Sequence, residues 1–278
     1  MIEAGRVKAR RKAGTVRRSS RSFLVVAGIC VVLGLSSTLM AQAGRGSEPN
    51  VTAKAIAPVD FSGQWVSLVT EDWRFRMVLP PKGDYAGVPL NPAGRKVADS
   101  WDPAKDESAG EQCKAYGAPA IMRAPGRLRI SWADDDALKI ETDAGTQTRM
   151  LSFKDPMGEG GDWQGLSRAS WMMTGNRSPM SARGPAGNSE SARRPTTLRV
   201  VTTNFRSGYL RKNGVPYSDK AVLTEYYDRT MEPDGTSYLV VTGVVEDPTY
   251  LNQQFITSSH FKKQNNQSGW NPTACSVR

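Results

Sequence analysis

Apolar and polar residues alternate through three short runs between Leu128 and Phe153. Alternation with a period of two is typical of a strand that has one buried face. The runs are separated by Asp134-Asp135-Asp136 and by Ala144-Gly145-Thr146, breaks that are too short to connect parallel strands. The pattern therefore predicts three consecutive strands of an antiparallel meander.

Similar patterns on both sides of the meander predict further strands at 65–79, 119–123, 163–173, 198–205, 221–229, 237–245 and 254–262. Asn91 followed by Pro92 predicts one short helix that ends by Trp101. A long loop is expected around Gly208 and Gly214. Many short strands and one short helix predict an all-β fold, a closed or partly open barrel, with a β-sandwich as the alternative.

The N-terminal residues carry a targeting pattern. Residues 1–22 are rich in Lys and Arg, an apolar run covers 23–40, and Ala41-Gln42-Ala43 follows. This order predicts a signal peptide over 1–43 that is cleaved after Ala43, and hence a periplasmic or extracellular protein. The alternative is an uncleaved membrane anchor over 23–40, because that run is near the lower length limit for spanning a bilayer.

The leader also accounts for most of the positive charge. The chain has 37 basic and 27 acidic residues, with a formal net charge of +10. Eight of the basic residues and one of the acidic residues lie in 1–43, so the remainder has a net charge of only about +3. The composition therefore does not indicate nucleic-acid binding, and we expect no nucleic-acid partner.

Composition also predicts how the rest of the chain is divided. Residues 44–59 are small, polar and Pro-containing, which indicates a flexible lead-in. Residues 60–278 are long enough to form a single β domain with a substantial core. Within that domain, 174–196 is dense in Gly, Ser, Pro and Arg and has no aliphatic residue larger than Met180. It is therefore predicted to be a disordered insertion.

Cysteine usage fits an exported protein. Cys30 lies in the leader, so Cys113 and Cys275 remain as one pair. A redox or metal site is the alternative to a disulfide, but His260 is the only histidine and a metal site needs more ligands. We therefore predict a Cys113–Cys275 disulfide, with no metal and no cofactor.

Two resemblances follow from motifs. Gly63-x-Trp65 on the first strand resembles the start of a lipocalin-type barrel, in which the Trp plugs one end. Over nearly all of 60–278 the chain is similar to a family of uncharacterised secreted bacterial β-rich proteins. That resemblance implies a secreted β-rich fold and brings no activity with it. The matching motifs are Pro119-Ala-Ile-Met-Arg123, Gly145-Thr-Gln-Thr-Arg149, Trp163-x-Gly165-x-Ser167, Thr224-Glu225-Tyr-Tyr-Asp-Arg229, Asp247-Pro248-x-Tyr250 and the late Cys275.

Two charged residues fall on otherwise apolar strand faces. Arg149 shares its face with Leu151, and Glu225 shares its face with Tyr227. A charge on an apolar face needs a partner, so we expect Arg149 and Glu225 to pair inside the barrel. The alternative is that both faces point to solvent. An inward pair would form a polar point in an apolar cavity, where Tyr227 and Trp65 would complete a ligand site.

The leading functional hypothesis is an exported β-barrel protein that binds a small apolar ligand. One alternative is an envelope structural or interaction module that is tethered by 23–40, in which case it would contact the membrane. The other is an enzyme, but Ser167 is not in a nucleophile-elbow motif and no nucleophile is indicated beside His260. No catalytic residue is assigned, and the oligomeric state is not predicted.

Overall fold

The computed structural model describes residues 51–156, 158–173 and 196–277. These residues belong to one compact unit. The predicted signal peptide over 1–43, and nearly all of the predicted insertion over 174–196, lie outside the described residues.

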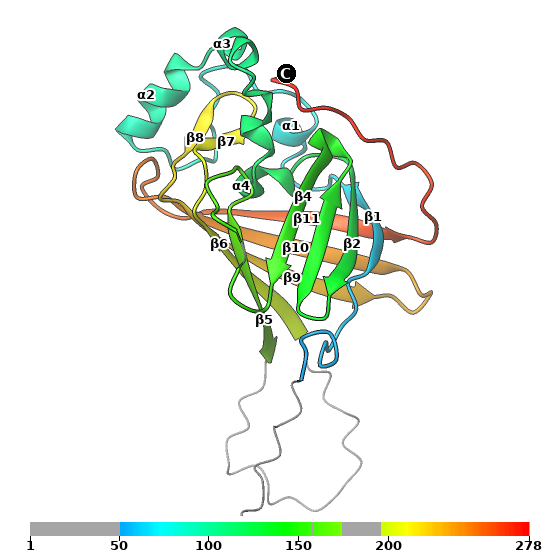
Figure 1. Cartoon of the computed structure of the whole chain (residues 1–278). Coiled ribbons are helices and arrows are strands. Elements are labelled where there is room, and N and C mark those ends of the chain that lie inside the picture. The colour runs from blue at the N-terminus through cyan, green and yellow to red at the C-terminus, as the bar shows by residue number, and fades with distance from the viewer. Residues whose placement is uncertain (1–50, 157, 174–195, 278) are drawn as a thin grey trace, which may run out of the picture. The chain divides into compact units, whose positions relative to one another are not determined.

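A closed barrel is the main element of the described part of the chain (Figure 1). The three strands of the predicted meander are present, and the predicted barrel is confirmed over the sandwich alternative. Around the barrel the order is β1 (Gly63–Leu68), β11 (Phe255–Gln264), β10 (Ser237–Glu246), β9 (Val222–Met231), β6 (Thr196–Thr203), β5 (Leu166–Met173), β4 (Gln147–Ser152), β3 (Ala137–Thr142) and β2 (Arg127–Asp134), which pairs with β1 again.

One pair of barrel strands departs from the predicted antiparallel pattern. Strand β5 runs parallel to β4, with Leu151 opposite Ser167 and Ser152 opposite Arg168. A parallel neighbour needs a long connection, and residues 153–165 provide it. The barrel is therefore mixed rather than purely antiparallel.

Short helices and a small hairpin gather at one end of the barrel (Figure 1). Four short α-helices are described where the sequence predicted one. The elements at this end are α1 (Trp73–Arg76), α2 (Pro92–Ser100), α3 (Pro103–Ser108), the 3-10 helix η1 (Gln112–Tyr116), α4 (Ala118–Ile121) and the β7–β8 hairpin (Gly208–Arg211 and Val215–Tyr217). A further 3-10 turn, η2 (Ala144–Thr146), joins β3 to β4.

The predicted helix from Asn91 is confirmed as α2. The Asn91 side chain accepts a hydrogen bond from the Gly94 N–H at 2.8 Å, and Pro92 is the first helical residue. Both features satisfy a helix N-terminus whose first N–H groups have no partner within the helix. Helix α3 has the same start, since Asp102 caps it before Pro103.

Three other local predictions are wrong. The strand predicted over 65–79 ends at Leu68, because the chain turns at Asp72 in the left-handed region (φ 50°) and enters α1. The segment 119–123 forms the helical turn α4, where Pro119 occupies the first turn without losing a hydrogen bond. The loop expected around Gly208 and Gly214 contains the β7–β8 hairpin.

The apolar side chains form two cores. The larger fills the barrel, and Tyr116 of η1 together with Ile121 and Met122 at the end of α4 extends it at one barrel end. The second lies between α2, the β7–β8 hairpin and the adjacent ends of β9, β10 and β11. At the start of the described chain, Ala53 is buried and its N–H donates to Asp136. Part of the predicted flexible lead-in is thus anchored.

Candidate functional site

The two predicted interior charges meet inside the barrel. Arg149 on β4 and Glu225 on β9 are each 1% exposed. Two guanidinium nitrogens donate to the two carboxylate oxygens, Nη1 to Oε1 at 3.0 Å and Nη2 to Oε2 at 2.6 Å. Strands β5 and β6 lie between β4 and β9 in the barrel wall. The pair therefore joins parts of the wall that do not hydrogen-bond to each other.

Three further polar side chains surround this ion pair. The Arg149 Nη2 donates to the Thr202 hydroxyl at 3.4 Å, and that hydroxyl bonds the Ser167 hydroxyl at 2.8 Å. Burial, followed by the Glu225 carboxylate, raises the pKa of Tyr227 well above its ordinary value. Burial disfavours the Arg149 charge, but Glu225 outweighs it and raises the pKa of Arg149. Arg149 therefore stays charged and Tyr227 stays neutral at physiological pH.

Trp65 is fully buried on β1, and its indole N–H donates to the Phe61 carbonyl at 2.9 Å. Large apolar side chains occupy the interior beside it, among them Leu138, Ile140, Leu151, Leu198 and Phe261. Arg149, Glu225, Tyr227 and Trp65 line none of the cavities described below. The ligand-binding role of these four residues stays a prediction.

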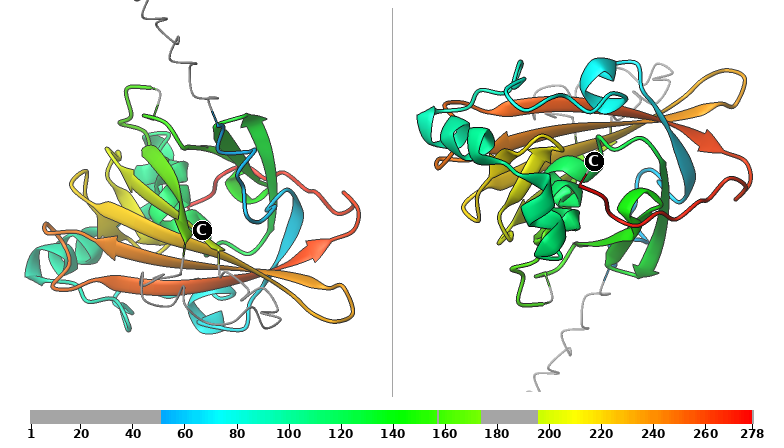
Figure 2. Two further views of the ribbon diagram at one scale, coloured as in Figure 1. Left: turned by 90° about the horizontal axis from the view of Figure 1, so that it is seen from below. Right: turned by 90° about the horizontal axis from the view of Figure 1, so that it is seen from above.

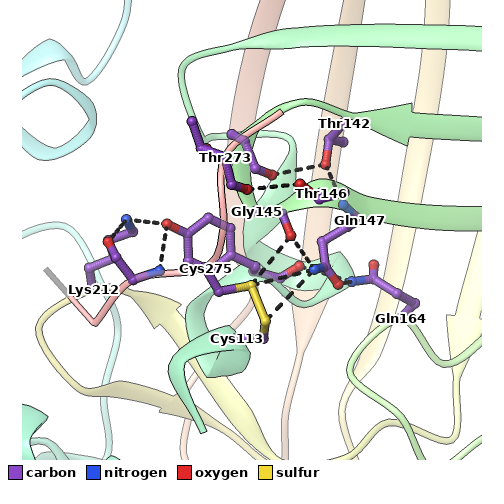
Figure 3. The surroundings of a disulfide bond; sticks show 12 residues. Cys113, Thr142, Gly145, Thr146, Gln147, Gln164, Lys212, Thr273 and Cys275 are labelled. Carbon is purple, nitrogen blue, oxygen red and sulfur yellow. Dashed lines mark hydrogen bonds between the residues drawn. A yellow bond between two sulfur atoms is a disulfide. The ribbon is translucent and has the colours of Figure 1, made fainter. Parts of the chain in front are cut away.

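The predicted disulfide between Cys113 and Cys275 is confirmed (Figure 3). It joins η1 to the segment that follows β11 and crosses one end of the barrel (Figure 2). The Thr273 N–H donates to the Asp143 carbonyl at 2.8 Å, and the Thr146 hydroxyl donates to the Thr273 carbonyl at 2.9 Å. The bond and these contacts hold the C-terminal segment against the β3–β4 turn.

A cavity of about 360 Å³ opens at this end of the barrel. We call it the barrel-end pocket. Its wall is formed by residues 75–80, by the segment around η1 and α4, by β7 and by Thr273 of the C-terminal segment. The apolar lining includes Phe75, Met77, Val78, Leu79 and Leu210.

Four cationic side chains line the same pocket, and they are Arg76, Arg123, Arg211 and Lys212. The three arginines are each less than one-tenth exposed. Sequence reasoning did not identify these residues. The sequence around Arg123 gave the only local indication, because this charge directly follows an apolar run. The turn at Asp72 and the unpredicted β7–β8 hairpin bring the other three residues to the pocket.

A larger cavity of about 830 Å³ lies outside the barrel wall, beside β4 and the 134–136 turn. Its ionisable lining is mostly acidic and includes Asp134, Asp135, Asp136, Asp155, Glu159 and Asp162. Within the described residues, no group of three or more His, Cys, Asp or Glu side chains has a geometry that could hold a metal ion. This cavity borders residue 157, which lies outside the described residues. We therefore favour the barrel-end pocket.

His260 has neighbours that the sequence did not indicate. Its Nε2 lies 3.2 Å from the Ser258 hydroxyl, and its Nδ1 lies 3.3 Å from a Glu71 carboxylate oxygen. The order serine, histidine, carboxylate is that of nucleophilic hydrolases. However, Ser258 and His260 lie on β11 and Glu71 follows β1, and neither Ser258 nor His260 lines a cavity found in the described part of the chain. A substrate would have no enclosed site beside the hydroxyl, so we assign no catalysis to it.

Among the described helices, none combines the length and the apolar character that a membrane crossing requires. The chain matches no protein-family model, no curated protein and no solved structure. The two resemblances drawn from sequence motifs therefore stay predictions.

Proposed function

We propose that this β-barrel protein binds a small, partly apolar molecule in the barrel-end pocket. The observation that carries the proposal is a preformed cavity of about 360 Å³ with a mixed apolar and cationic lining. Small-molecule sites are typically concave, largely apolar and supplied with a few polar groups, and their volumes run from about 300 to 1,000 Å³. The barrel interior supports the proposal less well because its own side chains fill it.

We further propose that the protein works in an exported compartment. The Cys113–Cys275 bond supports this part of the proposal, because disulfides persist mainly in oxidising compartments. The predicted signal peptide over 1–43 would supply the route, and N-terminal sequencing of the exported protein would locate the cleavage site.

A filling substitution tests the pocket directly. Ala115 lines it, and Ala115→Trp should occupy the space that the ligand needs. Ala104→Trp is the matched control, because Ala104 is exposed on α3 and does not line the pocket. Titration with octanol and with octanoate should shift the methyl NMR signals of Met77, Leu79 and Leu210 in the wild type and in Ala104→Trp, but not in Ala115→Trp.

Two other results would contradict this proposal. Shifts centred on Leu151 and Leu198 would move the ligand site into the barrel interior. No shift with either compound would argue against small-molecule binding and favour the interaction-module alternative. For that alternative, Trp73, Met77 and Val78 are 62%, 60% and 56% exposed, which gives the surface beside the pocket an apolar patch of the kind found in interfaces.

A further inference from the structure

The positive charge in the barrel-end pocket is only partly compensated. Arg76 forms an ion pair with Glu71, and Arg123 forms one with Asp72 at 3.0 Å. Neither Arg211 nor Lys212 has a carboxylate within ion-pair distance in the described part of the chain. Two of the four cations that line the pocket thus have no ion-pair partner among the described residues.

Arg211 is the more unusual of these two residues. It is 5% exposed, and among the described residues its side chain makes one hydrogen bond, from Nη1 to the Ala86 carbonyl at 2.7 Å. Its guanidinium lies 4.1 Å from the centre of the Phe75 ring. Among the described residues, its Nε and the Nη2 of Arg123 have no hydrogen-bond partner. Buried cations are almost always paired, because an unpaired charge in an apolar site is costly.

The titration behaviour of the pocket agrees with this geometry. Burial, followed by the neighbouring Arg123, lowers the pKa of Arg211 to about 10, although Asp72 and Asp84 act in the opposite direction. Lys212 donates to the Tyr116 hydroxyl at 2.6 Å. Burial raises the pKa of Tyr116, but the contacts with Lys212 and Ser276 together outweigh burial and lower this pKa. The pocket therefore disfavours additional positive charge and stabilises negative charge.

Resting on the function proposed above, we infer that the ligand is an amphiphile whose anionic group, a carboxylate or a phosphate, is held by Arg211 and Lys212. The apolar part of the ligand would lie against Val78, Leu79 and Leu210 on the same wall. An arginine provides a planar set of donors that matches carboxylate and phosphate oxygens, and a lysine adds a mobile point charge. The anion would supply the counter-charge that the protein leaves out.

Calorimetric titration with three ligands of equal chain length tests this inference. The ligands are octanoate, octyl phosphate and octanol, which share the apolar part and differ in the head. We expect both anions to bind the wild type at least about tenfold more tightly than octanol. The ratio of the dissociation constants of octanoate and octyl phosphate shows which head group fits better.

Variants then show which side chains cause the preference for the anions over octanol. Arg211→Met and Lys212→Met should each reduce the preference for the anions and leave the affinity for octanol nearly unchanged. Arg168→Met is the matched control, because Arg168 is an exposed arginine outside the pocket and should keep the full preference. If Arg211→Met does not fold, Lys212→Met and the salt dependence of the wild type still decide. Raising the salt concentration roughly tenfold should weaken only the anions.

The outcomes separate the two proposals. If octanol binds the wild type as tightly as the two anions do, the anionic ligand is ruled out and the apolar binding site stands. If none of the three ligands binds, the proposed function fails and this inference fails with it. A preference for the anions that survives in both Met variants would also overturn the assignment to Arg211 and Lys212.

Discussion

Removing either partner of the interior ion pair should destabilise the barrel strongly. The loss should be larger than for either partner of an exposed ion pair. Arg149→Met leaves the Glu225 carboxylate buried without its counter-charge. Glu225→Gln likewise leaves the Arg149 guanidinium buried without its counter-charge. Both side chains are 1% exposed, so neither orphaned charge reaches water. The loss of one partner of such a buried pair costs about 3–5 kcal/mol in the free energy of unfolding.

The double variant is expected to cost no more than the worse of the two single variants, because it leaves no orphaned charge. If the two sites were independent, the costs would add instead. The difference gives a coupling energy of about 3 kcal/mol. The bidentate contacts at 3.0 and 2.6 Å place the pair in the strongly coupled class.

Urea unfolding of the wild type, the two single variants and the double variant measures the coupling, with the disulfide kept intact throughout. Arg168 and Asp155 supply the control cycle, since their 2.9 Å contact involves side chains that are 64% and 91% exposed. That exposed pair should show no measurable coupling. Additive costs for Arg149 and Glu225, within about 0.5 kcal/mol, would refute the argument that the two charges depend on each other inside the barrel.

Two other predictions concern stability. Replacing Cys113 and Cys275 together by Ser should lower the free energy of unfolding by at most about 5 kcal/mol, which the chain-entropy model gives for a loop of this length. A thiol count on the denatured, unreduced protein verifies the bond first. Two free thiols per chain would contradict the disulfide. Arg211→Met should cost less than about 1 kcal/mol in the ligand-free protein, because it removes an uncompensated buried charge. Since the pKa of folded Arg211 is about 10 and therefore below its ordinary value, the penalty for this charge is full below pH 10 and declines above it. Urea unfolding at neutral pH measures the effect, and a loss as large as that for Arg149→Met would show that Arg211 has a structural counter-charge.

The strand periodicity of this sequence was sufficient to predict most of the barrel. Alternation fixes which face of a strand is buried, and a register slip would expose the whole face. That is why the placement of Arg149 and Glu225 on apolar faces predicted a contact between residues that lie on strands separated by two others. The Asn91-Pro92 helix start was also predictable from local sequence, because the Asn91 side chain binds an N–H group only three residues away.

The helices and the hairpin at the barrel end that carries the pocket could not be predicted in the same way. Trp73 and Met77 follow a strand-like alternation, yet a single left-handed residue at Asp72 turns the chain away, and the two side chains are 62% and 60% exposed. The barrel-end pocket depends on this turn and on where the β7–β8 hairpin packs. Sequence by itself determined most of the barrel strands, the interior charge pair and the disulfide partners, since each follows from a local pattern or from elimination. Only the tertiary structure brought Arg123, Arg211 and Lys212 together, because the pocket is made by contacts between segments whose own patterns do not specify one another.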